Sequence, residues 1–120
     1  MTRFISISSN AELLRIPSEF LMFITADGNY SKVYIKGGES RLVSFQLGQL
    51  EDLIAEQLGE EQSPFIRIGK SLIVNRDYVY HIDTTNLKLL LSDWNGKCYE
   101  QKASRKALIE LKLVLEQNLI

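Results

Sequence analysis

Alternating and continuous apolar runs in the first half of the chain predict short strands joined by tight turns. Residues 20–24 form a continuous apolar run, which is typical of a strand buried on both faces. The sequence Asp27-Gly28-Asn29 then predicts a hairpin turn, because Gly and Asn tolerate positive φ. From 30 to 35 every second side chain faces the same side of the predicted strand, and Gly37-Gly38 ends it before a return strand over 41–45.

The period changes to that of a helix in two places. Between 44 and 58, leucine and isoleucine recur every three or four residues, which predicts an amphipathic helix with an acidic outer face. A second helix is predicted over 104–119, with Ser104 as its N-cap. Because Ile109, Leu113 and Ile120 lie beside the main apolar stripe of this helix, we expect a second packing surface there, such as a homodimer contact. The main stripe consists of Leu108, Leu111, Val114, Leu115 and Leu119.

The stretch from 65 to 83 is the most strongly patterned part of the second half. Two apolar arms flank the polar turn Gly69-Lys70-Ser71, and a further strand is predicted from 78 onward. The arms are either ordinary core strands, or they hold a cationic turn of Lys70, with Arg67 and Arg76 nearby, toward a partner. The segments that follow are a turn at 84–86, a strand over 87–91, a hairpin at 93–96 with Asn-Gly as a type I′ pair, and a return strand over 97–102.

The first residues of the chain have three open interpretations. Residues 1–10 are a tail, a linker remnant of a larger protein, or an edge strand through 4–7. The run from Leu13 to Pro17 predicts at best an edge strand, because proline cannot donate a hydrogen bond inside a sheet. A chain of 120 residues, of which 45% are hydrophobic, is long enough for one core. We therefore expect a tail or linker over 1–10 and one folded domain over 11–120.

Composition argues against several classes of function. The chain lacks an apolar run of about 18 residues that would cross a membrane, and its start lacks the apolar core of a signal peptide. The single Cys98 cannot form an internal disulfide, which favours a reducing, cytoplasmic setting. With one His, one Cys and neither standard Gly-rich phosphate loop, the sequence predicts no metal site, no cofactor and no enzymatic activity.

Charge is uneven along the chain although it nearly cancels overall. A net charge of −1 taken alone argues against a nucleic-acid binder, which usually has a basic footprint. Residues 51–61, however, contain five acids and no base, whereas residues 65–112 contain nine Lys and Arg against five Asp and Glu, a net +4. Such a distribution allows a basic face on one part of the fold.

Three motifs follow one another along the chain, with the acidic helix between the first two. They are Ala26-Asp27-Gly28-Asn29-Tyr30, the segment 68–75 and Lys102-Ala103-Ser104-Arg105-Lys106. In this order they resemble the motifs of the LytTR-type DNA-binding domains. The resemblance covers roughly residues 19–114. In the middle motif Lys70 stands where the family has a basic or polar residue, and Gly69 stands where the family often has His. In the wider signature stretch 65–82, the other matching residues are Phe65, Arg67, Ser71, Val74 and Asn75.

The resemblance implies a mainly β fold, a LytTR-like β-sandwich of short antiparallel strands, in which loops enter the DNA grooves. Carried over position by position, it implies that Tyr30, Lys70 and Arg105 reach DNA. A planar arginine fork suits bidentate contact with guanine or phosphate, and lysine suits guanine acceptors or a phosphate. The further contacts that it implies are Lys102, Ser104 and Lys106 at phosphates, with Asn29, Ser31, Lys32 and Ser71 in support.

Each of the three principal candidates also has a purely structural interpretation. Tyr30 is then a half-buried strand tyrosine, Lys70 a solvated lysine, and Arg105 a helix-start arginine paired with Glu100. An arginine in the first turn of a helix opposes the helix dipole, so its placement there favours a role toward a ligand.

The function that the resemblance implies is sequence-specific binding of double-stranded DNA by a transcriptional regulator, with loops in successive major grooves. It also implies direct-repeat promoter sites and a homodimer on DNA, without a membrane partner. Most members carry a phosphorylated receiver domain, so this chain is either a stand-alone regulator or the C-terminal domain of one. The alternative is a LytTR-like protein-interaction module with little DNA affinity, which the near-neutral charge and Gly69 favour. Binding that weakens steeply with salt supports the first function, and binding through Ile109 and Leu113 the second.

Overall fold

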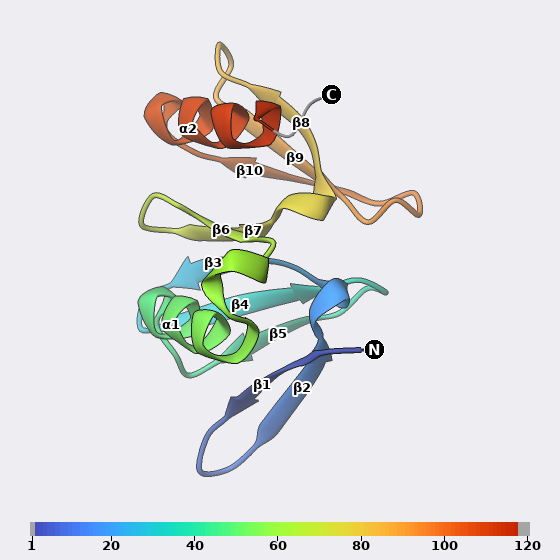
Figure 1. Ribbon diagram of the computed structural model, residues 1–120, viewed down its shortest axis with the longest axis vertical. Helices are drawn as coiled ribbons and strands as arrows, with labels where there is room; N and C mark the ends of the chain where they lie inside the picture. The colour runs from blue at the N-terminus through green and yellow to red at the C-terminus, as the bar shows by residue number, and fades with distance from the viewer. Residues whose placement is uncertain (1, 118–120) are drawn as a thin grey trace.

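A five-stranded antiparallel sheet lies across the middle of the molecule and separates two hydrophobic cores (Figure 1). The computed structural model describes residues 2–117, apart from the side chain of Gln62. The strand order in this sheet is β5-β4-β3-β7-β6. Its members are β3 (Leu21–Asp27), β4 (Tyr30–Ile35), β5 (Ser40–Val43), β6 (Phe65–Ile68) and β7 (Leu72–Asn75).

Each face of the central sheet is covered by one helix and one smaller sheet. The first face packs against α1 (Leu47–Leu58) and the hairpin of β1 (Phe4–Ser8) and β2 (Leu13–Pro17). The second face packs against α2 (Arg105–Glu116) and a sheet ordered β10-β9-β8. The predicted class, a mainly β sandwich of antiparallel strands with two helices, is confirmed. The remaining elements are β8 (Val79–Asp83), β9 (Lys88–Ser92), β10 (Cys98–Lys102) and the 3₁₀ turns Ser18–Phe20, Glu60–Gln62 and Arg76–Tyr78.

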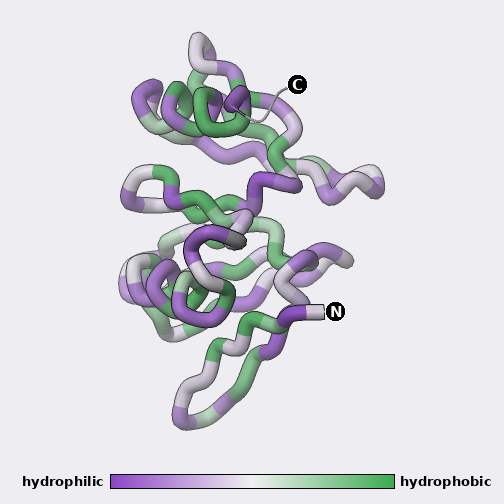
Figure 2. The backbone as a smooth tube through the Cα atoms, in the orientation of Figure 1, coloured by the Kyte–Doolittle hydropathy of each residue, from purple (hydrophilic) through white to green (hydrophobic). Residues whose placement is uncertain are grey.

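The continuous apolar runs of β3 and β7 follow from this central position. Leu21 and Ile24 of β3 belong to the first core, whereas Met22 and Phe23 belong to the second. A register shift between Leu21 and Phe23 accompanies this change of face. In Figure 2 the hydrophobic colour follows the strands between the two helices, while the turns are polar. A strand buried on both faces needs apolar residues at successive positions, as the sequence predicted.

The N-terminal segment adopts the third of its open interpretations. Residues 4–8 form β1, whose side chains Ile5 and Ile7 are buried in the first core. The side chain of Gln57 on α1 ties this strand down, because it accepts from Ser6 N at 2.8 Å and donates to Ser6 O at 2.9 Å. Within residues 2–117 the strand that ends at Pro17 pairs with β1 alone, so its predicted edge position is confirmed.

Both predicted helices form, each with a side-chain cap. Helix α1 begins at Leu47 rather than 44, because Gln46 and Gln49 form a reciprocal capping box before it. The predicted cap of α2 is confirmed, since Ser104 Oγ accepts from Ala107 N at 3.2 Å. Leu119 and Ile120 lie outside the described residues, and α2 ends at Glu116 within them. None of the helices in residues 2–117 is long and apolar enough to span a membrane.

The packing of α2 differs from the predicted stripe at one position. Leu108 and Leu111 are buried, whereas Val114 is more than a third exposed. Ile109 and Leu113 are exposed, as expected for residues beside the stripe. The second packing surface predicted for them stays a prediction.

The loop between β9 and β10 is not the two-residue Asn-Gly turn that the sequence predicted. The register pairs Ser92 with Cys98, so five residues form the loop. Positive φ falls on Trp94 (59°) and Gly96 (98°). Asp93 organises the loop, because its carboxylate accepts from the backbone N–H groups of Asn95 at 2.8 Å and Lys97 at 3.0 Å. These bonds hold the pKa of Asp93 below its ordinary value, and the bond from Lys97 N has the largest effect. The hydrogen bonds from the short Asp93 side chain to its own loop stabilise this five-residue loop in place of a type I′ turn.

Candidate nucleic-acid interface

Three loops carry the residues that the sequence assigns to a nucleic-acid contact, and the fold brings them to one edge. The first loop is the β3–β4 turn with Asn29 and Tyr30, the second is the β6–β7 turn at 69–71, and the third is the β10–α2 junction at 102–106. Antiparallel pairing of β3 with both β4 and β7 puts the first two side by side, and Ala26 N donates to Ser71 O at 2.9 Å. All three lie along the left side of Figure 1.

The first loop is a tight turn held against the start of α1. Gly28 has φ +63° while Asn29 keeps negative φ, which is the pattern of a type II′ hairpin turn. The side-chain oxygen of Asn29 accepts from Gln46 Nε2 at 3.2 Å. Tyr30 is 48% exposed, so its ring is available at the edge.

Two further residues of β4 were assigned supporting roles, and the structure separates them. Lys32 is exposed, and its Nζ lies 5.5 Å from the ring centroid of Tyr34. Ser31 is fully buried and donates to Phe45 O at 2.7 Å. Ser31 therefore ties β4 to the segment before α1, and its assignment as a surface contact is wrong.

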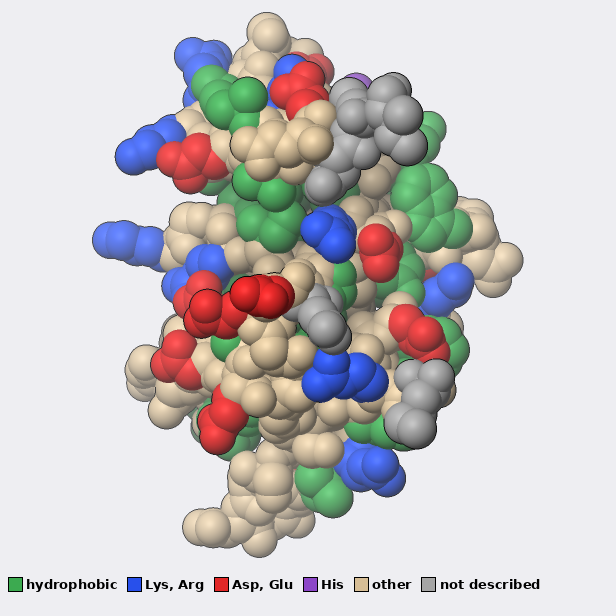
Figure 3. All heavy atoms as spheres, in the orientation of Figure 1, with side chains coloured by type: hydrophobic (Ala, Val, Ile, Leu, Met, Phe, Trp, Pro, Cys, Tyr) green, Lys and Arg blue, Asp and Glu red, His purple; other side chains and the backbone are tan. Residues whose placement is uncertain are grey.

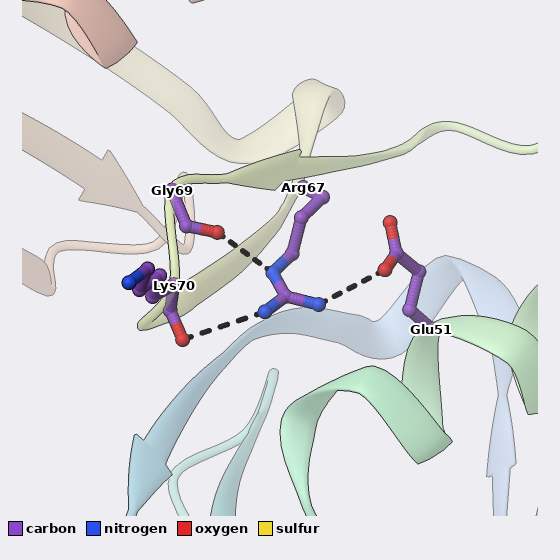
Figure 4. A network of polar contacts seen from close by, with 4 residues as sticks. All are labelled: Glu51, Arg67, Gly69 and Lys70. Carbon is purple, nitrogen blue, oxygen red and sulfur yellow. Dashed lines mark hydrogen bonds and ion pairs between the residues drawn. The ribbon is translucent and has the colours of Figure 1, made fainter.

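The second loop presents Lys70 and Ser71 to solvent. Arg67 was expected to add to a cationic turn, but its side chain folds back under the loop (Figure 4). Its Nε donates to Gly69 O at 2.9 Å, and one terminal nitrogen donates to Glu51 Oε1 at 2.9 Å. Arg67 thus lies near Lys70 as expected, whereas Arg76 follows the far end of β7, so the expectation that Arg76 lies near Lys70 is wrong.

The third loop exposes four polar side chains around the start of α2. Arg105 Nε donates to Thr84 O at 3.1 Å, which anchors its guanidinium to the β8–β9 turn. Among the ion pairs of residues 2–117, Glu100 lies 4.0 Å from Lys88 Nζ and is not paired with Arg105. The structural interpretation that pairs Arg105 with Glu100 is therefore wrong, because Arg105 bonds Thr84 instead. The exposed residues of this loop are Lys102, Ser104, Arg105 and Lys106.

A hollow of about 690 Å³ lies between the second and third loops. Ser71 lines it from one side and Ser104 from the other, with Lys88 and Lys102 against the single acid Glu100. Figure 3 shows Lys and Arg side chains along this edge and a group of acidic side chains beside them over α1. The predicted acidic outer face of α1 is confirmed, because its acids and those directly after it are exposed. Charge is thus separated in space as it is along the chain.

One residue of the middle motif, Asn75, and one residue shortly after it, Tyr78, have structural roles that sequence reasoning missed. Asn75 is fully buried; its Nδ2 donates to Leu21 O at 3.0 Å and its Oδ1 accepts from Asp77 N at 2.9 Å. Tyr78 is buried as well and its hydroxyl donates to Glu19 O, and this burial raises its pKa. An Asn between an apolar strand and a following turn is a cap signal that could have identified the role of Asn75. No local signal marks the bond between Arg67 and Glu51.

Comparison with known proteins identifies the family and the fold. The family model of the LytTr DNA-binding domain matches residues 11–116. A solved LytTr DNA-binding domain from Bacillus cereus, described as part of a methyl-accepting/DNA response regulator, has the same fold, with a TM-score of 0.64. The two chains are 21% identical, over 96% of this chain and 98% of that one. No curated protein matches the sequence. With a family match over nearly its whole length, the chain belongs to the LytTr DNA-binding domain family.

Proposed function

We propose that this domain binds double-stranded DNA sequence-specifically, as the DNA-reading part of a transcriptional regulator. The observation that carries this proposal is the alignment of three exposed loops on one edge, each with residues suited to DNA. The family supplies DNA as the partner, and the edge supplies the surface. A direct-repeat target occupied by two copies of the domain is part of the same proposal.

The three loops form one short row on this edge. The first two are joined by the bond from Ala26 N to Ser71 O at 2.9 Å, and the second and third line the same hollow. Neighbouring major grooves on one side of B-DNA lie about 34–36 Å apart, which is most of the 43 Å length of the whole molecule. Contact with successive major grooves is therefore proposed for two copies of the domain on a direct repeat, because the loops of one copy are too close together to span that distance.

In this proposal Arg105 and Lys70 contact the bases. Because Arg105 Nε is engaged by Thr84, the bidentate contact with guanine is made by its two terminal amino groups. The anchor also limits the freedom that the side chain loses on binding. Lys70 extends from a turn that two strands hold, and it contacts guanine acceptors or a phosphate. Tyr30 packs its half-exposed ring on sugar or a thymine methyl.

The phosphate contacts gather around the hollow between the second and third loops. Lys102, which lines the hollow, and Lys106, exposed in the first turn of α2, supply charge, and Ser71 supplies a hydroxyl. Ser104 Oγ already accepts from Ala107 N, but a hydroxyl keeps its hydrogen for donation to a phosphate oxygen. Asn29 and Lys32 extend this set at the first loop.

One observation favours a second candidate function, a protein-interaction module. Ile109 and Leu113 are 42% and 54% exposed on the outer side of α2, and apolar side chains grouped in this way suit a protein partner. The same surface also suits contact between two copies on a direct repeat. Binding lost on Leu113→Ala but indifferent to salt would support the interaction module.

The test is a selection from a random double-stranded DNA library with the purified domain, followed by gel-shift titration of the enriched sequence at two salt concentrations. We expect an enriched repeated motif whose affinity falls with salt. Arg105→Ala should cost roughly 1–3 kcal/mol, or about 5- to 150-fold in affinity, and relax preference at one base pair. The matched control is Arg41→Ala, which removes the same charge from the opposite edge, where Arg41 pairs with Glu39 at 3.2 Å. Equal losses for both variants, or no enriched motif, would contradict the proposal.

A further inference from the structure

We infer that Arg67 is a positioning residue that presents the second loop to DNA, and that Glu51 on α1 holds it in place. This inference rests on the proposed function, because it concerns how the Lys70 turn is aimed at a duplex. Arg67 is a basic residue next to a basic loop, so its simplest role would be one more phosphate contact. The hydrogen bonds of Arg67, however, lie inside the protein.

All three nitrogen groups of the Arg67 guanidinium are engaged inside the protein (Figure 4). Nε bonds Gly69 O, one terminal nitrogen bonds Glu51 Oε1 at 2.9 Å, and the other approaches Lys70 O at 3.4 Å. Two successive carbonyls of the turn are thus tied to a side chain that is itself tied to α1. The side chain is only 27% exposed, which further separates it from a solvated phosphate ligand.

The turn needs such support because of its glycine. Gly69 has φ +60°, and open space surrounds the position that a Cβ would occupy. Backbone conformation rather than crowding therefore explains a glycine there, and glycine brings the largest conformational freedom of any residue. Bonds from Arg67 to the carbonyls of Gly69 and Lys70 remove much of that freedom before DNA arrives. A pre-ordered loop binds more tightly because less ordering remains to be done in the complex.

The sign of the effect at Glu51 distinguishes positioning from simple electrostatics. Glu51 is a negative charge beside the basic edge, so electrostatics alone predicts that Glu51→Gln raises DNA affinity. If Glu51 holds Arg67 in place, the same change lowers affinity. Glu56→Gln is the matched control, because it removes an equal charge from the exposed side of the same helix.

A second variant separates the arginine fork from its charge. Arg67→Lys keeps the positive charge but cannot reach two turn carbonyls and Glu51 with one nitrogen. A phosphate contact would survive this change with most of its affinity, whereas a positioning role would not. The salt slope checks that any loss of affinity does not come from a lost phosphate contact, because each such contact adds about 0.9 to the slope of log K against log salt and lysine keeps the charge.

The experiment measures binding of wild type, Glu51→Gln, Glu56→Gln and Arg67→Lys to the selected duplex at several salt concentrations, with amide hydrogen exchange of each unbound protein. We expect Glu51→Gln and Arg67→Lys to lose roughly three- to tenfold in affinity with an unchanged salt slope, because they loosen a loop without removing a phosphate contact. Exchange at Gly69 to Ser71 should rise in both while α1 stays protected. Glu56→Gln should stay within about twofold of wild type.

The outcomes separate this inference from the function on which it rests. If wild type selects no DNA sequence, the proposed function fails and the positioning role is overturned with it. If wild type binds a selected site, but Glu51→Gln binds as well as or better than Glu56→Gln, only the positioning role is overturned. Wild-type affinity and unchanged loop exchange in Arg67→Lys would assign Arg67 to a phosphate instead, because lysine keeps a phosphate contact.

Discussion

Asn75 shows how a single polar side chain can join two distant parts of this fold. Its amide nitrogen bonds the carbonyl of Leu21 at the start of β3, and its amide oxygen caps the turn that follows β7. Because the side chain is fully buried, both bonds form where water cannot replace them. Its place inside a motif shared with DNA-binding domains thus has a structural reason.

Asn75→Ala should destabilise the domain by roughly 1–3 kcal/mol, because the carbonyl of Leu21 and the amide of Asp77 lose their partner. Urea denaturation measures the change. Asn10→Ala, at an exposed position between β1 and β2, is the control and should change the free energy of unfolding by less than about 0.5 kcal/mol. Equal stability of the two variants would show that other groups or water satisfy the buried carbonyl.

At the scale of elements, two glycines close to Arg67 have opposite reasons for being there. Gly69 lies in the β6–β7 turn at φ +60°, where a side chain strains the backbone whatever the space. Gly48 lies in the first turns of α1, and a Cβ there would meet Arg67 at an ordinary contact distance of 4.0 Å. The turn depends on its glycine, whereas the helix tolerates one.

The same substitution should therefore change stability in opposite directions at these two positions. Gly69→Ala should destabilise by about 1–2 kcal/mol, the cost of a left-handed alanine. Gly48→Ala should stabilise by roughly 0.5–1 kcal/mol, because alanine loses less backbone freedom in a helix. Thermal unfolding of both proteins checks the pair. A stabilising Gly69→Ala would mean that the turn relaxes to negative φ, and that its bonds to Arg67 are weaker than their distances indicate.

At the scale of the whole molecule, the central sheet is stable only when both of its faces are covered. The second face is covered by the three-stranded sheet with α2, and the first by α1 with the β1–β2 hairpin. Ile5 and Ile7 bring two buried side chains to the first core, from residues that precede the family match. The hairpin is therefore packed as part of the fold, and the division of the chain at residue 10 stays a prediction.

Ile5→Ala decides between a structural hairpin and a dispensable tail. Truncating a fully buried isoleucine should cost about 2–5 kcal/mol, because a cavity remains under α1. Leu13→Ala, at an exposed position on the same hairpin, should cost less than about 0.5 kcal/mol. Chemical denaturation should show one cooperative transition for both. If Ile5→Ala unfolds like wild type, residues 1–10 do not contribute to the stability of the core.

The sequence alone determined those features that depend on neighbours in the chain. Helical spacing located α1 and α2, and Ser104 was predicted as a cap. The apolar run at 20–24 predicted a doubly buried strand, which is right for 21–24 and wrong for Phe20, which is 44% exposed before β3. The three motifs that carry Tyr30, Lys70 and Arg105 were likewise visible, because each is contiguous. Patterns of this kind express backbone geometry over a few residues, so they need no tertiary contact to be read.

Only the tertiary structure decided how these local pieces meet. Pairing of β3 with β7 placed the first loop beside the second, and packing of the small sheet brought the third to the same edge. Arg67 bonds Glu51, which lies 16 residues away in the sequence, and Asn75 bonds Leu21, which lies 54 residues away. The Asn-Gly turn failed because Asp93 bonded its own loop. Such contacts depend on distances in space, whereas the spacing of residues along the chain predicts contacts only within one or two turns of the backbone.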